Sequence, residues 1–263
     1  MPDRPVVLTI AGLDPSGGAG IVADIKTIAT FGCFPAAALT SITFQNTTGV
    51  FGAEHQTAAT LRAQIEPVVN DLAVRAVKTG MLPSAAIVSE VVRLFSEMKL
   101  PSPVIDPVMV STSGHDLIGE EAFQIVKNEL LKLARIVTPN IPEAERLAGF
   151  AISGESDMRR AAQTIKALGP KAVLVKGGHR HRSTQEAVDI LLNDIGEFHE
   201  FRGEYFDVGE VHGSGCTLSA AIASGLALNF GLEDAVGEAK RYVSHWIRAL
   251  REASRIGRGA RPL

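Results

Sequence analysis

The chain has few cysteines, little net charge and no long apolar run, and each of these scarcities excludes a class of protein. Its 263 residues include two cysteines, Cys33 and Cys216, and no C-x-x-C pair. We therefore expect neither a disulfide framework nor a cysteine-ligated metal. The low cysteine content is typical of a protein in a reducing compartment. The formal net charge of −3 provides no basic surface for nucleic acid. No apolar stretch of about 18 residues is free of charges or breaks, so no membrane span is expected.

The amino-terminal residues also lack the pattern of a secretion signal. The apolar run 6–10 begins at once, without a basic region, a long apolar segment and a small-residue cleavage site. We therefore expect a cytoplasmic protein. The hydrophobic fraction of 46% is enough for a sizeable core, and we expect a single domain over 1–263. Its last residues, 255–263, are rich in Arg and Gly and are predicted to be a loose tail.

Two common nucleotide-binding signatures are missing. Residues 12–20 read Gly-Leu-Asp-Pro-Ser-Gly-Gly-Ala-Gly and lie between an apolar run and a helical pattern. The spacing is not the G-x-G-x-x-G of a dinucleotide fingerprint. Gly20 is followed by Ile-Val and not by Lys-Ser/Thr, so the segment is no P-loop either. The loop is predicted to hold something small and polar, and a nicotinamide site is disfavoured.

Short apolar runs alternate with amphipathic helical patterns along most of the chain. Strands are expected over 6–10, 36–43, 73–82, 103–109, 134–138, 171–175, 187–192 and 197–202. Helical periodicity lies between most of them and ends in a long helix over 233–251. This alternation predicts an α/β fold with a doubly wound, mainly parallel sheet and helices on both faces.

Polar residues follow the carboxyl ends of these strands, where ligands bind in such sheets. They are accompanied by one methionine, and the set is Asp14, Gln45, Met81, Asp106, Asn140, Glu143 and Lys176. One polar strand end means little, because Asn46 and Thr47, for example, can equally cap a turn. Six strand ends of the same kind are better explained by a site.

The stretch 212–221 carries the strongest local signal. Gly213, Ser214 and Gly215 precede Cys216, and an apolar helical pattern starts there. Glycines let several backbone N–H groups converge, and a helix amino terminus adds positive potential, so an anion cradle is predicted. Cys216 in the first turn is expected to have a lowered thiol pKa. Alternatively, Gly-x-Gly before a helix is common, and a lone cysteine is more often a small buried apolar residue.

Several motifs occur together in one order. They are 11–27 (AGLDPSGGAGIVADIKT), 45–47 (QNT), 78–82 (KTGML), 106–109 (DPVM), 138–143 (TPNIPE), 176–179 (KGGH) and 212–219 (HGSGCTLS). With them the chain resembles the ribokinase superfamily, and within it the hydroxymethylpyrimidine/phosphomethylpyrimidine kinase family of thiamine biosynthesis. The resemblance implies a ribokinase-like kinase domain that uses ATP and Mg²⁺ on a small pyrimidine, commonly as a homodimer.

The resemblance also implies roles for individual residues. Gln45 would bind the pyrimidine edge, and the pocket around it would include Ala19, Asp24, Met81 and Val108. Asn140 and Glu143 would form the N-x-x-E element that organises Mg²⁺, with Glu143 holding the metal directly or through water. Asp106 and Lys176 would lie near the nucleotide phosphates, and Gly213, Ser214, Gly215 and Cys216 would form the anion hole.

Two departures from the family pattern concern the cradle and the carboxyl end. Ser214 replaces the commoner threonine, which keeps the hydroxyl, and no appended thiamine-synthesis domain is expected after the last helix. Most of the superfamily has an aspartate base where this chain has Cys216. Our hypothesis is that Cys216 accepts the hydroxymethyl proton as a thiolate, or hydrogen-bonds the alcohol, and forms no phosphocysteine.

Two other functions remain open from the sequence. Relatives with the same fold and the same cysteine phosphorylate vitamin B6, so a pyridoxal/pyridoxine kinase is the nearest alternative. A non-catalytic protein that binds a pyrimidine or a nucleotide is the other, and Glu143, Lys176 and Cys216 together argue against it. The sequence does not decide between one phosphorylation step and two.

Overall fold

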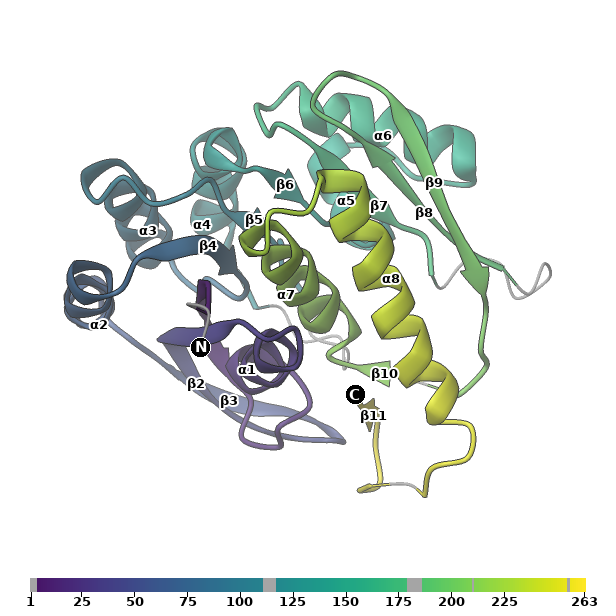
Figure 1. The fold of residues 1–263 in the computed structure, drawn as a ribbon, viewed down its shortest axis with the longest axis horizontal. Coiled ribbons are helices and arrows are strands. Elements are labelled where there is room, and N and C mark those ends of the chain that lie inside the picture. The colour runs from purple at the N-terminus through teal and green to yellow at the C-terminus, as the bar shows by residue number, and fades with distance from the viewer. Residues whose placement is uncertain (1–3, 111–116, 179–185, 210, 255) are drawn as a thin grey trace.

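A nine-stranded sheet forms the centre of the computed structural model, which describes residues 4–110, 117–178, 186–209, 211–254 and 256–263. The strand order is β3-β2-β1-β4-β5-β6-β7-β8-β9 (Figure 1). The strands are β1 (Val6–Leu13), β2 (Phe34–Asn46), β3 (Gly49–His55), β4 (Val74–Thr79), β5 (Val104–Ile105), β6 (Ile136–Val137), β7 (Val173–Lys176), β8 (Glu186–Leu192) and β9 (Phe198–Glu204). A separate two-stranded pair joins β10 (Val211–His212) to β11 (Arg261–Pro262).

The middle of the sheet is parallel and both of its edges are antiparallel. Pairing is parallel from β2 through β1, β4, β5 and β6 to β7. The hairpin partner β3 closes one edge, and β8 with β9 closes the other. The chain leaves β1 for β2 on one side and returns to β4 on the other, so the strand order reverses between β1 and β4. Ligands bind at such a switch point, beyond the carboxyl ends of the strands.

Helices cover both faces because alternate strand residues point to opposite sides. On β1, Val7 belongs to a core with α1 (Gly20–Thr30), α7 (Ser214–Ala227) and α8 (Leu232–Ala249), which are seen in front of the sheet in Figure 1. Leu8 belongs to the second core, on the opposite face. The helices of that face are α2 (Ala58–Asp71), α3 (Ala85–Glu97), α4 (Glu120–Asn128), α5 (Ile141–Ala148) and α6 (Glu155–Lys166).

The predicted fold class is confirmed, and the differences lie in strand lengths and edges. The apolar runs 103–109 and 134–138 supply only two paired residues each, in β5 and β6. Both strands are buried on both faces, so their apolar runs extend past the paired residues. The edge strand β3 was not predicted, because its pattern of glycine and half-exposed residues has no clean alternation.

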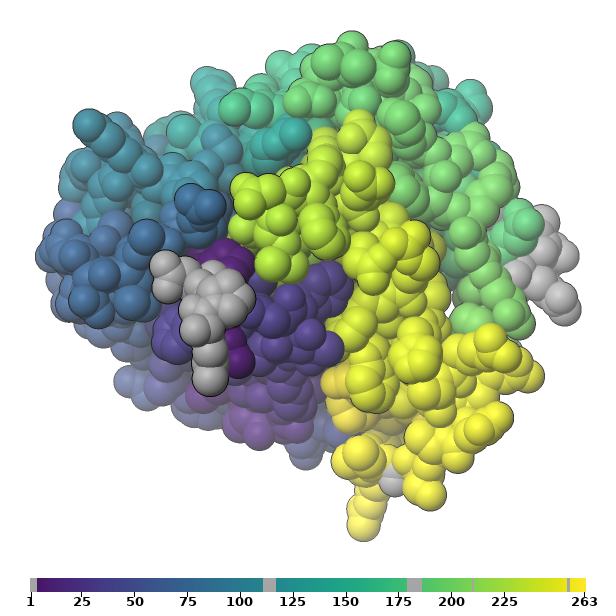
Figure 2. Space-filling model, viewed as in Figure 1, coloured from purple at the N-terminus to yellow at the C-terminus, as the bar shows by residue number. Residues whose placement is uncertain are grey.

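The segment 256–263 differs from the loose tail that its composition predicts. Arg261 and Pro262 form β11 beside β10, and Ala260 donates a backbone hydrogen bond to the Thr47 carbonyl at 2.7 Å. Figure 2 shows this yellow end of the chain lying against the purple amino-terminal elements. An Arg- and Gly-rich composition predicts a flexible segment when that segment is isolated. In this structure, backbone hydrogen bonds to distant loops hold residues 256–263 in place.

A buried ion pair lies between the sheet and α1. Lys78 Nζ is 3.0 and 2.8 Å from the two carboxylate oxygens of Asp24, and neither side chain is exposed. Thr9 Oγ1 donates a third hydrogen bond to that carboxylate at 2.6 Å. Burial by itself lowers the pKa of Lys78, but the negative charges of Asp24 and Asp106 raise it above its usual value. Lys78 is therefore a fixed positive charge.

Replacing Lys78 by Met is expected to lower the free energy of unfolding by about 3–5 kcal/mol, because it leaves the Asp24 carboxylate buried without its partner. Urea denaturation monitored by circular dichroism measures this. The double variant Lys78→Met/Asp24→Leu removes both charges and is expected to regain most of the loss. A single variant as stable as the wild type would contradict the ion pair.

Candidate active site

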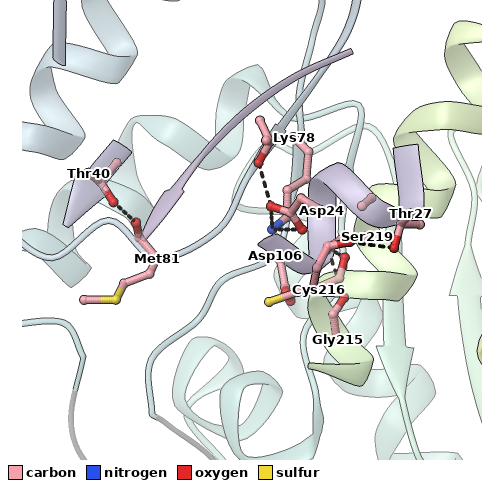
Figure 3. Close-up of polar contacts among 12 residues, drawn as sticks. Asp24, Thr27, Thr40, Lys78, Met81, Asp106, Gly215, Cys216 and Ser219 are labelled. Atoms are coloured by element: carbon pink, nitrogen blue, oxygen red, sulfur yellow. Dashed lines mark hydrogen bonds and ion pairs between the residues drawn. The ribbon is translucent and has the colours of Figure 1, made fainter. Parts of the chain in front are cut away.

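The predicted strand-end residues meet the helix amino terminus at the switch point. Gly215, in the first turn of α7, has no side chain, and a Cβ there would lie 3.2 Å from Lys176 Nζ and 3.5 Å from Asp106 Oδ2. Lys176 comes from the end of β7, and Asp106 follows β5. Three segments far apart in the chain thus present a cation, an anion and backbone N–H groups to one place. Figure 3 shows Asp106, Gly215 and Cys216 together there.

The cradle (Gly213, Ser214, Gly215 and Cys216) begins with a backbone shape that only glycine allows. Gly213 is the N-cap of α7 with φ +83°, and among the described residues no side chain caps this helix. The first N–H groups of a helix have no intrahelical acceptor. A Cβ on Gly213 would lie 1.8 Å from the Gly18 carbonyl oxygen. The cradle therefore packs directly against the backbone of the loop 12–20.

Asp14 organises that glycine-rich loop from within. Its carboxylate, 2% exposed, accepts hydrogen bonds from the backbone N–H groups of Ser16, Gly18 and Ala19 at 2.8–3.1 Å. His212 Nε2, which directly precedes the cradle, lies 2.9 Å from Asp14 Oδ2. Burial alone raises the pKa of Asp14, but hydrogen bonds from His212, Ser16 and Gln45 hold it well below its usual range. Asp14 is thus a charged carboxylate around which the loop is hydrogen-bonded.

The residues expected around the pyrimidine lie on the β1–β4 side of the cradle. Gln45 hydrogen-bonds Asp14, and Ala19 follows in the loop that Asp14 holds. Met81 follows β4, where Gly12 leaves room for its sulfur: a Cβ on Gly12 would lie 3.2 Å from Sδ. Val108 lines a small cavity beside Gly80 and Asp106. These four residues come from the end of β2 and from the segments that follow β1, β4 and β5.

Asp24 is the member of the predicted set that the structure separates from solvent. Its side chain is fully buried, and both carboxylate oxygens are held by Lys78 and Thr9. The local motif places Asp24 in the second turn of α1, but the helix turns it towards the sheet. Its position suits it to hold Lys78 near Cys216 (Figure 3), and it exposes no surface for contact with a ligand.

Lys176, Asp106 and Glu143 form the charged side of the site. Lys176 Nζ lies 3.1 Å from Asp106 Oδ1, and both side chains are largely buried. Burial lowers the pKa of Lys176, but Asp106 and Glu143 raise it above its usual value. The ammonium group is therefore charged and already paired.

Glu143 has a local structural role that was not predicted. Its Oε2 accepts the Asn140 N–H at 2.7 Å, and Asn140 Oδ1 accepts the Glu143 N–H at 2.9 Å, which makes a capping box at the start of α5. Burial raises the pKa of Glu143 to about 7, although the charge of Lys176 opposes this. One oxygen of the Glu143 carboxylate is thus used to cap α5. The carboxyl group changes its protonation state near neutral pH.

The expected lowering of the Cys216 pKa is wrong for this structure. Burial raises the pKa of the thiol to about 11, although the positive charge of Lys78 lowers it and the negative charges of Asp24 and Asp106 raise it further. The helix amino terminus favours a thiolate, but it does not offset the removal of the sulfur from water. Cys216 is therefore a thiol at neutral pH. Cys33 lies in the core, as expected.

The oxygen donors fit Mg²⁺ only in part. Asp106 and Glu143 are the carboxylates nearest the cradle, and each already accepts hydrogen bonds. Within the described ranges, no group of three or more His, Cys, Asp or Glu side chains is arranged to hold a metal ion. Mg²⁺ tolerates such sites because it keeps several waters and binds substrate phosphates. The arrangement suits a metal that arrives with a nucleotide.

Two important residues escaped the sequence reasoning. Lys78 stands in a strand that also carries Arg75, and only the tertiary structure reveals its contact with Asp24 and the effect of its charge on Cys216. His212 opens the motif 212–219, where the sequence assigns it no partner, but it hydrogen-bonds Asp14 across 198 positions of sequence. No local pattern encodes such a contact. His179 and His181, which follow β7, lie outside the described residues.

Comparison with known proteins gives a consistent result. The family model described as phosphomethylpyrimidine kinase matches residues 14–263. A hydroxymethylpyrimidine/phosphomethylpyrimidine kinase of Streptomyces coelicolor is 44% identical over 245 residues, which are 93% of this chain and 89% of that protein. The thiamine biosynthesis bifunctional protein ThiED of Geobacter sulfurreducens is 43% identical over 99% of this chain, and the match spans 52% of that longer protein.

Solved structures agree on the fold. The phosphomethylpyrimidine kinase of Clostridium difficile 630 superimposes with a TM-score of 0.81 at 43% identity and covers 93% of this chain and 100% of that one. The pyridoxal kinase of Staphylococcus aureus in complex with AMP-PCP and pyridoxal has a TM-score of 0.88 at 28% identity, over 99% of this chain and 93% of that one. The ribokinase-like fold is thereby confirmed. No helix among the described residues is long and apolar enough to span a membrane.

The raised pKa of Glu143 predicts a stability loss on going from pH 5 to pH 7. An acid with a raised folded-state pKa binds its proton more tightly when folded, so its contribution to stability is full below the ordinary glutamate pKa of 4.5 and is lost as the pH approaches about 7. The decrease is expected to be on the order of 2 kcal/mol. Urea denaturation of wild type and Glu143→Gln, without Mg²⁺, isolates the effect. Parallel pH profiles for the two proteins would contradict it.

Proposed function

Because this chain belongs to the phosphomethylpyrimidine kinase family, we propose that it transfers a phosphoryl group from ATP to 4-amino-5-hydroxymethyl-2-methylpyrimidine and then to the resulting monophosphate, in thiamine diphosphate biosynthesis. The observation that carries the proposal is the convergence at Gly215 of Lys176, Asp106 and the amino terminus of α7. Phosphoryl transfer needs charge neutralisation and alignment more than covalent chemistry. A site with a charged lysine and free helical N–H groups supplies both.

Lys176 and the cradle divide the negative charge between them. Lys176 is a point charge suited to the β- and γ-phosphates. The N–H groups of Ser214, Gly215 and Cys216 are suited to the transferred phosphoryl group, on which charge grows in the transition state. Lys176 and Asp106 form an ion pair in this structure. An arriving phosphate would attract Lys176 away from Asp106, and the Asp106 carboxylate would then be available to a cation.

Asp106 and Glu143 are the residues that would hold Mg²⁺ in this site. When bound with the nucleotide, the ion would neutralise phosphate charge and keep several of its own waters. Glu143 is best suited to a contact through water, since one of its oxygens caps α5. Asn140 keeps Glu143 in place through the reciprocal hydrogen bond.

The pyrimidine would bind on the other side of the cradle. Gln45 offers an amide acceptor and two donor hydrogens to a heterocycle edge, and its contact with Asp14 fixes its orientation. Ala19, Met81 and Val108 provide apolar surface for the ring. The hydroxymethyl group would then point to Cys216, whose sulfur is a proton acceptor once ionised.

The proposal also covers domain organisation, location and partners. Residues 1–263 would act as one kinase domain in the cytoplasm, without nucleic acid or membrane partners. A homodimer is expected from the family. Each part is open to direct measurement by fractionation and light scattering.

Product analysis tests the proposed function most directly. Incubation with ATP, Mg²⁺ and hydroxymethylpyrimidine is expected to give first the monophosphate and then the diphosphate, identified by mass. Gln45→Ala is expected to raise the KM for the pyrimidine about tenfold, since it removes a polar ring contact. ATP consumption without a phosphorylated pyrimidine would rule out the proposal.

Pyridoxal is the second candidate substrate, because a pyridoxal kinase complex shares the fold over 99% of this chain. Side-by-side turnover of pyridoxal and hydroxymethylpyrimidine separates the two activities. We expect the larger kcat/KM with the pyrimidine, since relatives named for the pyrimidine kinase are about 40–44% identical to this chain, whereas that pyridoxal kinase is 28% identical.

Cys216→Ala is expected to lower kcat by about 10²–10⁴-fold, the usual contribution of a general base, while the KM for the pyrimidine changes little. Steady-state kinetics measure both constants. Because the thiol pKa is about 11, wild-type kcat should also rise with pH through the neutral and mildly alkaline range, as more thiolate forms. Cys33→Ala is the matched control for loss of a cysteine. Near wild-type turnover by Cys216→Ala would remove the base role.

A further inference from the structure

The segment 256–263, which we call the strap, crosses three loops of the candidate site. Gly259 N–H reaches Thr47 Oγ1 at 3.3 Å, and Ala260 N–H donates to the Thr47 carbonyl at 2.7 Å. The strap then pairs with Val211 and His212, and Leu263 N–H donates to the His212 carbonyl at 3.3 Å. Thr47 lies in the β2–β3 turn, and His212 directly precedes the cradle. The strap thus joins the turn to the cradle.

The third loop is the glycine-rich one, and Pro262 covers it. A Cβ on Gly18 would lie 2.8 Å from Pro262 Cβ and equally close to the His212 ring. At its other side the strap is fastened to the end of α8. The Arg261 guanidinium donates hydrogen bonds to the Leu250 and Ala253 carbonyl oxygens. The strap is therefore anchored on the residues that directly follow α8 while it contacts the site.

The contact with Thr47 is too close for any residue but glycine. A Cβ on Gly257 would lie 2.4 Å from Thr47 Oγ1, and one on Gly259 would lie 1.7 Å from the Thr47 carbonyl oxygen. Both distances are far below van der Waals contact. A side chain at either position has to push the β2–β3 turn away from the strap. The two glycines therefore set where Thr47 lies.

Thr47 is two residues from Gln45, which acts on the pKa of Asp14 and which the proposed function assigns to the pyrimidine. We propose that the strap is a positioning element for the pyrimidine: by holding the β2–β3 turn, it fixes Gln45 relative to the cradle. Its residues touch the loops that bind and need not touch the substrate. This inference rests on the proposed function, because it assigns the strap to the pyrimidine side of that same site.

A matched pair of glycine substitutions tests the strap. Gly257 and Gly32 both have φ +79° and both are exposed, so alanine strains their backbones alike, but a Cβ on Gly32 meets nothing within 4 Å. Gly257→Ala is expected to raise the KM for hydroxymethylpyrimidine about tenfold relative to Gly32→Ala, since a small misplacement of a binding group is costly. The KM for ATP should stay within about twofold, because Lys176 and Asp106 do not contact the strap. Steady-state kinetics with each substrate varied in turn give both values.

A second substitution separates displacement of the turn from loss of fold. Thr47→Ala removes the Oγ1 and Cγ2 atoms that crowd position 257 and leaves the Cβ at 3.2 Å. The double variant Gly257→Ala/Thr47→Ala is therefore expected to recover a pyrimidine KM close to that of Thr47→Ala alone. A merely destabilised protein would show a lower melting temperature without such recovery.

Three outcomes overturn the strap proposal: equal pyrimidine KM values for Gly257→Ala and Gly32→Ala, an equal rise in the KM for ATP, or a double variant no better than Gly257→Ala. Each of these presupposes that the wild-type enzyme phosphorylates the pyrimidine. Failure of the wild type to do so overturns the proposed function instead, and calorimetric titration with the pyrimidine alone then shows whether the strap variants still differ in binding.

Discussion

The contact between the glycine-rich loop 12–20 and the amino terminus of α7 is the one on which the rest of the site depends. Gly213 approaches the Gly18 carbonyl so closely that a Cβ would lie 1.8 Å from it. This contact brings the end of the first strand against a helix that begins about two hundred residues later. Asp14 secures the contact on one side by accepting backbone N–H groups and His212. The strap covers it on the other side through Pro262. Without this approach the cradle would have no fixed position relative to the pyrimidine side.

Charge compensation is the second constraint. Two ion pairs, Lys78–Asp24 and Lys176–Asp106, lie around the cradle, together with the hydrogen bond between His212 and Asp14. In a region of low dielectric each charge needs a partner, and an unpaired one is costly. In the proposed reaction a nucleotide would add several negative charges to this set, so Lys176 would exchange its partner and a cation would accompany the phosphates. The same low dielectric explains why Cys216 remains a thiol.

The raised thiol pKa changes how the reaction is best viewed. With a pKa of about 11, Cys216 is a weak base at rest, and an incoming phosphate disfavours the thiolate further. Lys78 is the nearby charge that opposes this effect, and Asp24 holds Lys78 in place. We therefore propose that the Asp24–Lys78 pair acts on the reaction through Cys216. This view replaces the predicted direct contact between Asp24 and the pyrimidine.

Local rules account for those parts of the structure that involve neighbours in sequence. Ser84 caps α3 as its position before a helical pattern predicts, and the alternation of strands and helices predicts the sheet. The Asn140–Glu143 capping box is equally local, and its N-x-x-E spacing is typical of one. The family resemblance implied a metal-binding role for the same two residues. The hairpin strand β3 was missed because half-exposed edge residues carry no strong periodicity.

The sequence by itself thus determined the fold class, the cradle and the strand ends that bear polar residues, because these follow from periodicity, glycine content and the geometry of parallel sheets. The tertiary structure alone decided which charges meet. It paired Lys78 with Asp24 and His212 with Asp14, it raised the pKa of the Cys216 thiol, and it fastened the segment 256–263 to Thr47. The physical reason is that pairing, desolvation and close approach depend on distances between residues far apart in the chain, which no local pattern encodes.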